Sequence, residues 1–174
     1  EHWKLLENYF QEYVKRDCNM MLTPLFTSPL DTAIGLERTT CQLIDVEVKD
    51  GEYVFGFEKL KRWIDLCKKC GIEYFEMSHL FSQWGAKYAP KVVATVNGKK
   101  EKIFGWHTPA VGEYTKFLES FLPQLTAKLR KWEIADVTYF HISDEPREEH
   151  LESYKAAKES LGNMLDGFHT LDAL

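Results

Sequence analysis

The stretch that most constrains the fold is residues 137–146, Val-Thr-Tyr-Phe-His-Ile-Ser-Asp-Glu-Pro. Its first six residues are apolar or prone to β structure on both alternating faces, which predicts a strand inside the protein. Pro146 predicts that a helix starts there. We therefore expect Asp144 and Glu145 at a strand-to-helix turn, on the carboxyl side of the strand, where α/β folds keep their chemistry.

The rest of the chain alternates between the same two kinds of element. Apolar residues at helical spacing predict helices over 3–14, 57–70, 111–132 and 146–161, and β-prone runs predict strands over 20–26, 41–48, 53–57, 72–77 and 168–174. Pro123 is expected to kink or split the third helix. This order favours parallel strands joined by crossovers. Because a closed barrel needs eight strands and roughly 250 residues, we expect an α/β fold that is a partial (β/α)₈ TIM barrel.

A β-hairpin is the clearest local prediction. Val92–Val96 and Ile103–Trp106 flank Asn97-Gly98, a pair suited to a type I′ turn. The hairpin, at about 91–106, looks like an insertion into a single barrel domain that spans residues 1–174.

Composition excludes several classes of protein. With 44% hydrophobic residues the chain is globular, and its net charge of −5 with no basic block argues against a nucleic-acid partner. No apolar run is long enough for a membrane span, and no signal peptide is visible. The cysteines are too sparse for a disulfide framework, which favours free thiols and a cytoplasmic location. Cys67 and Cys70 end a predicted helix, so we assign them to structure rather than to redox chemistry.

Two adjacent carboxylates at a strand end allow several interpretations. Asp144 could cap the helix begun by Pro146, with Glu145 in solvent. A second interpretation is a metal site formed by His141 and the two acids, although the spacing matches no common zinc or calcium pattern. A third is a glycosidase with two carboxylates on either side of the scissile bond, roughly 5 to 5.5 Å apart for retention or roughly 6.5 to 9.5 Å apart for inversion. The fourth suits neighbouring acids better: a 2-acetamido sugar supplies its own nucleophile, and one acid holds its acetamide.

Four motifs together resemble glycoside hydrolase family 123, which largely overlaps domain of unknown function 4091. They are Leu25-Phe-Thr-Ser-Pro-Leu-Asp-Thr32, the segment from Cys70 to Lys87, Phe104-Gly-Trp106 and Tyr139-Phe-His-Ile-Ser-Asp-Glu-Pro146. The resemblance extends in order from about residue 19 to residue 161.

The resemblance implies a retaining β-N-acetylgalactosaminidase with a barrel flanked by β-sandwich domains, which this chain lacks. Asp144 would orient the 2-acetamido group, whose oxygen attacks the anomeric carbon to give an oxazolinium-like intermediate. Glu145 would protonate the leaving oxygen and later deprotonate water, which requires a raised pKa. No metal or organic cofactor is implied. The implied partner is a glycan or glycolipid oligosaccharide, and self-association could cover an open barrel edge.

Other residues are candidates for sugar binding. His79 and Trp84 follow the strand over 72–77, where an imidazole can bond a hydroxyl and an indole can stack on a sugar. Asp31 and Arg38 share a loop and either bind hydroxyls or pair with each other. Trp106 either stacks on a sugar or packs at the end of the hairpin.

His141 lies inside the strand that leads to the acids, so we expect it to orient a catalytic group rather than to touch substrate. Two rivals to the glycosidase remain. One is a non-catalytic carbohydrate-binding or scaffold module on the same fold. The other is a barrel hydrolase with a metal at the acids.

Overall fold

The computed structural model describes residues 1–28, 33–144 and 147–172. Its elements in chain order are α1 (His2–Val14), β1 (Met20–Thr23), β2 (Asp45–Lys49), β3 (Glu52–Gly56), α2 (Glu58–Cys70), β4 (Tyr74–Met77), β5 (Val92–Val96), β6 (Lys99–Phe104), α3 (Glu113–Lys131), β7 (Thr138–His141), α4 (Leu151–Ser160) and β8 (His169–Leu171). Short 3₁₀ turns, Ala135–Val137 and Glu148–His150, precede β7 and α4.

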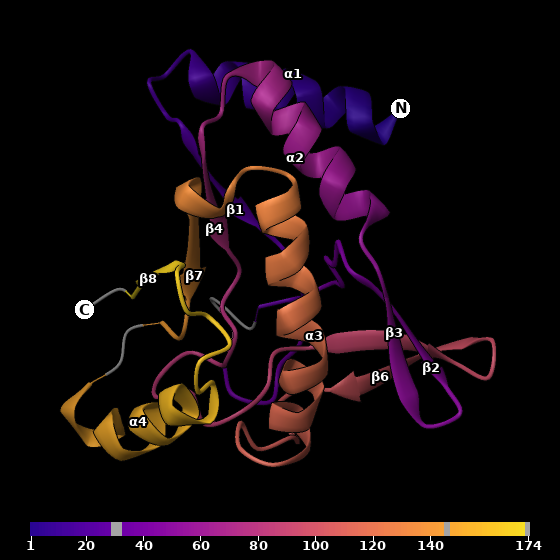
Figure 1. Cartoon of the computed structure of the whole chain (residues 1–174), viewed down its shortest axis with the longest axis vertical. Helices are drawn as coiled ribbons and strands as arrows, with labels where there is room; N and C mark the ends of the chain where they lie inside the picture. Colours follow the sequence, from indigo (N-terminus) through magenta and orange to yellow (C-terminus); the bar gives the residue numbers. More distant parts are fainter. Residues whose placement is uncertain (29–32, 145–146, 173–174) are drawn as a thin grey trace.

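The strands form two sheets. The first is parallel throughout, in the order β1-β4-β7-β8. The second has the order β3-β2-β5-β6, with two antiparallel hairpins joined by parallel pairing of β2 with β5. Helices α1 and α2 lie at one end of the molecule and α4 at the other (Figure 1). The expected α/β class is therefore confirmed.

Helix α2 shows how the sequence produces its local structure. Leu60, Ile64 and Cys67 recur at helical spacing and are buried, as expected. Gly71 ends the helix in the left-handed conformation, with φ of 99°, which glycine adopts without a steric penalty. The chain then turns directly into β4, so the helix returns the backbone to the parallel sheet.

Helix α3 corrects the expectation that Pro123 splits the segment, because the helix runs unbroken through it. Pro123 and Glu119 both lie on the exposed face, where water can satisfy the carbonyl that the missing N–H leaves free. On the opposite face Phe117 packs against rings of the second sheet, including Phe55 at 5.5 Å and Phe104 at 5.1 Å between centroids. Aromatic burial therefore holds α3 together across the proline.

The hairpin of β5 and β6 forms as expected, with Asn97 and Gly98 at φ of 50° and 78°. Its second strand starts earlier than predicted, at Lys99. Strand β2 starts later than predicted, at Asp45, because the Gln42 side chain bonds the backbone of Val93 on β5 in place of ladder pairing. Among the described helices, none is long and apolar enough to cross a membrane.

A further correction concerns the start of the last helix. Arg147 is extended, with φ of −109° and ψ of 169°, and a 3₁₀ turn comes before α4 begins at Leu151. The helix therefore does not start at Pro146, a residue outside the described ranges. Asp144 lies too far upstream to be its N-cap, so the helix-capping interpretation of Asp144 is wrong.

Candidate active site

The carboxyl ends of β4 and β7 continue side by side beyond the sheet. Leu80 and Phe81 donate backbone N–H groups to the carbonyls of His141 and Ile142, at 2.9 and 3.0 Å. The Trp84 N–H then donates to the carbonyl oxygen of Asp144 at 2.9 Å. This pairing fixes the backbone that follows His79 and the backbone that leads to Asp144, at the edge where the sequence placed the chemistry.

His79 and Asp144 meet at this edge. His79 Nε2 lies 3.9 Å from Asp144 Oδ1, and the Asp144 side chain is partly exposed. His79 itself is only 4% exposed, and neither of its ring nitrogens has a hydrogen-bond partner within the described part of the chain. Burial, and secondarily the neighbouring His141, lowers the pKa of His79 to about 3. The imidazole is therefore neutral at physiological pH and can donate one hydrogen bond and accept another.

The ring of His141 packs against the ring of His79. The two rings are 3.7 Å apart between centroids. His141 Nδ1–H donates to Glu76 Oε1 at 2.8 Å, and this hydrogen bond lowers the pKa of Glu76. The bond to Glu76 fixes the ring of His141, and its other nitrogen, Nε2, lies 3.9 Å from Asp172 Oδ1. The contact is consistent with the orienting role expected of His141 from its strand position, with Glu76 as its anchor.

Sequence reasoning missed two anchors of this site. Asp172, just after β8, accepts the backbone N–H of Ser143 at 2.9 Å and the hydroxyl of Tyr154 on α4. These bonds tie the residue before Asp144 to two other elements. Nothing in the sequence around Asp172 signals this contact, since β8 is short and irregularly patterned. Glu76 carried a signal, because it is a lone charge inside an otherwise buried strand.

An open pocket of about 350 Å³ adjoins this edge of the sheet. It is lined by Ile34, Ser82, Gln83, Trp84, Lys87, Tyr88, Trp106, Arg147, Glu149 and His150. Two of the predicted sugar-binding residues, Trp84 and Trp106, therefore share one pocket. Trp84 has a φ of 58°, a conformation that costs a bulky residue about 1–3 kcal/mol and that clusters at functional sites.

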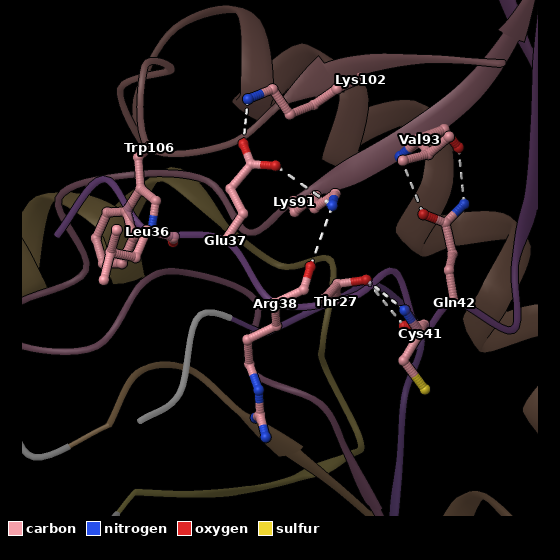
Figure 2. A network of polar contacts seen from close by, with 10 residues as sticks. All are labelled: Thr27, Leu36, Glu37, Arg38, Cys41, Gln42, Lys91, Val93, Lys102 and Trp106. Atoms are coloured by element: carbon pink, nitrogen blue, oxygen red, sulfur yellow. Dashed lines mark hydrogen bonds and ion pairs between the residues drawn. The ribbon is translucent and has the colours of Figure 1, made fainter. Parts of the chain in front are cut away.

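Trp106 is also fixed in place by packing. Its indole N–H donates to the carbonyl of Leu36 at 2.8 Å, and its ring meets Tyr88 edge-on. Figure 2 shows the surrounding network, in which Glu37 pairs with Lys91 and Lys102 and so ties the loop of residues 33–42 to the hairpin. Trp106 thus forms part of the pocket wall while its polar atom is used in holding the loop.

Arg38 does not line the pocket that Trp84 and Trp106 share. Its carbonyl accepts Lys91 Nζ at 3.1 Å, while its side chain extends away from the network (Figure 2). It lines a different pocket, of about 530 Å³, beside Leu22 on the edge strand β1. The predicted pairing of Arg38 with Asp31 lies outside the described residues, as does Glu145.

The cysteines fit the structural assignment. The four thiols are free, as expected. Cys67 is fully buried in α2, and desolvation raises its pKa to about 12. A thiol that stays protonated at neutral pH is a poor redox group.

The edge of the parallel sheet also brings possible metal ligands together. His79, His141 and Asp144 each offer a donor atom, and these atoms lie within 4.8 Å of one another. The sequence had grouped His141 with the two acids but had not placed His79 among them. His79 follows the end of β4 and His141 lies on β7, so only the tertiary structure brings the two imidazoles together.

Comparison with known proteins identifies a matching family and a solved structure of similar fold. The family model of the glycoside hydrolase 123 catalytic domain matches residues 1–174. A family 123 glycoside hydrolase from Clostridium perfringens, described in a structural study of glycolipid glycan hydrolysis, superposes with a TM-score of 0.71 at 17% identity. The match covers 99% of this chain and 30% of that enzyme. No curated protein sequence matches the chain significantly.

Proposed function

The chain belongs to the glycoside hydrolase 123 catalytic-domain family, and from this membership we propose that it hydrolyses terminal β-linked N-acetylgalactosamine with retention of configuration. The observation that carries the proposal is that Asp144 and a buried, neutral His79 lie 3.9 Å apart at the carboxyl edge of the parallel sheet. Both side chains reach this edge from neighbouring strands. A glycan or glycolipid oligosaccharide is the substrate class.

The mechanism is substrate-assisted. Asp144, as a carboxylate, accepts the N–H of the 2-acetamido group and turns its carbonyl oxygen toward the anomeric carbon. That oxygen forms a bond to the anomeric carbon as the glycosidic bond breaks, which gives an oxazolinium-like intermediate. Glu145 donates the proton that the leaving oxygen takes and then removes a proton from the water that opens the ring.

The remaining residues divide between binding and support. His79 has two buried nitrogens with no hydrogen-bond partner among the described residues, which fits bonding to a sugar hydroxyl. Trp84 and Trp106 supply aromatic faces for the sugar or its neighbour. His141 holds His79 through ring contact, and Glu76 holds His141.

We also propose that the parallel sheet is part of a (β/α)₈ barrel in a single domain, with the β5–β6 hairpin as an insertion. Supporting this, the strand order β1-β4-β7-β8 follows chain order and each connection contains a helix. Consecutive barrel strands are neighbours in the same way.

The test is hydrolysis by the full-length protein of an aryl 2-acetamido-2-deoxy-β-galactoside beside its 2-hydroxy counterpart. Substrate assistance predicts turnover of the first sugar and almost none of the second. Equal rates on both sugars would exclude the acetamide mechanism. Binding of N-acetylgalactosamine without turnover of either compound would favour a carbohydrate-binding module instead.

A further inference from the structure

Three buried ring nitrogens at the end of the parallel sheet lack a hydrogen-bond partner within the described chain: Nδ1 and Nε2 of His79, and Nε2 of His141. A buried polar group left without a partner costs about 1–3 kcal/mol, so such groups usually meet water, a ligand or an ion. We propose that His79, His141 and Asp144 bind a divalent transition-metal ion of the zinc class, and that the bound ion inhibits the enzyme.

The spacing of the donors suits such an ion after a small adjustment. The three donor atoms lie within 4.8 Å of one another, and His79 Nε2 is 3.9 Å from Asp144 Oδ1. A tetrahedral zinc ion with bonds of about 2.0–2.2 Å keeps its donors about 3.3–3.6 Å apart. Asp144 is 26% exposed, so rotation of its side chain can close this difference without moving the core.

The contacts of His141 also suit a metal. Its Nδ1 bonds Glu76, so Nε2, which has no hydrogen-bond partner among the described residues, is the nitrogen left for an ion. A carboxylate behind a metal-binding imidazole fixes the ring and strengthens it as a ligand. Two imidazoles and one carboxylate leave a fourth position open, and imidazole donors favour zinc or copper over magnesium or calcium.

The ion inhibits because it binds residues that the substrate also needs. An ion on Asp144 occupies the carboxylate that orients the acetamide, and an ion on His79 occupies the nitrogens that face the sugar. Metal and substrate therefore compete. The inhibition rests on the proposed function, whereas the metal binding rests only on these three residues and on Glu76.

Binding is tested on the full chain after treatment with a chelator. Titration with Co²⁺ should give visible d–d absorption that saturates at one ion per chain, and Zn²⁺ should displace it. Glu76→Gln should weaken Co²⁺ binding by about tenfold, the usual effect of losing such a supporting carboxylate. His79→Gln and Asp144→Asn each remove a ligand and should weaken it further. His169→Gln, on the exposed start of β8, is the matched control and should bind as the wild type does.

Failure of the metal site is distinguishable from failure of the proposed function. Absence of saturable Co²⁺ absorption, or equal binding by wild type and Asp144→Asn, would overturn the site even if His79→Gln fails to fold. Asp144 is the useful variant here because it is partly exposed. Saturable Co²⁺ binding with no hydrolysis of the acetamido substrate would support the metal site and contradict the proposed glycosidase activity. In an active protein, Zn²⁺ should raise KM, and chelator should restore it.

Discussion

The two sheets use polar residues in opposite ways. At the carboxyl edge of the parallel sheet, Glu76, His79 and His141 are partly or fully buried and contact one another. On the mixed sheet, charged groups form solvent-exposed ion pairs with residues of opposite charge, such as Asp45 with Lys59 at 2.6 Å. Parallel strands all end at one edge, so the residues beyond their carboxyl ends converge, whereas the two strands of a hairpin run in opposite directions and end at opposite edges.

The polar residues of the two sheets also differ in how much they contribute to the free energy of folding. Exposed ion pairs on the mixed sheet contribute little individually, because water and salt screen them. The pairs of Glu37 with Lys91 and Lys102 hold the loop of residues 33–42 against the hairpin (Figure 2). The buried groups of the parallel sheet leave nitrogens without partners among the described residues, which costs stability but presents them to a ligand. Substitutions at matched positions in the two sheets test this contrast.

The largest effect is expected at Asp144. Asp144→Asn removes the charge that orients the acetamide and should lower kcat/KM on the aryl 2-acetamido substrate by about 10²–10⁴-fold. Asp45→Asn on the mixed sheet is the matched control and should keep wild-type activity. Comparable rates for the two variants would remove Asp144 from the mechanism.

A large effect on folding is expected at Gly85, beside the active-site edge. Its φ is +100°, and an added Cβ would lie 2.6 Å from the Cβ of His150. Gly85→Ala should therefore destabilise the fold by about 2–5 kcal/mol, from backbone strain and overpacking together. Gly98 in the hairpin turn has a φ of +78° with open space around it. Gly98→Ala should cost only the strain, about 1–2 kcal/mol. Urea unfolding of both variants measures the difference, and equal losses would show that His150 moves aside freely.

A smaller contrast is expected between two glutamates. Glu76→Gln weakens a charge-assisted hydrogen bond to a buried histidine and should cost about 1.5–3 kcal/mol. Glu37→Gln disrupts the pairs that the exposed Glu37 makes with Lys91 and Lys102, and should cost less than about 1 kcal/mol. Chemical unfolding in low salt and again in high salt compares them. Only the Glu37 contribution should shrink as salt rises; a salt-dependent loss at Glu76 would contradict its burial.

The smallest effect is a pH dependence on the mixed sheet. The hydrogen bond from Lys102 lowers the pKa of Glu37 below its ordinary value of 4.5. A lowered pKa means that the stabilisation is present above pH 4.5 and is lost as the pH falls through the folded-state value. Thermal melts of wild type and Glu37→Gln should therefore differ slightly at neutral pH and converge in acid. A difference that grows toward acid would reverse the sign of this linkage.

The sequence predicted much of the fold because its local signals were unambiguous. The apolar spacing of α2 with Gly71 behind it, and Asn97-Gly98 between two β-prone runs, each specify one local structure. The errors fall where distant contacts override local preference. Pro123 stays helical because its face is exposed while Phe117 and Phe121 anchor the other side. Residues 41–44 leave the strand because side chains of Thr27 and Gln42 bond the backbone there.

By itself the sequence determined that a buried strand delivers Asp144 to its carboxyl end and that another strand delivers His79 to the same kind of position. Local patterns specify where a strand ends and which residues come after it. Only the tertiary structure decided that these strands are neighbours, that His141 stacks under His79, and that Glu76 and Asp172 hold them. Those contacts join residues up to 65 positions apart, and no local pattern encodes a distance across a sheet.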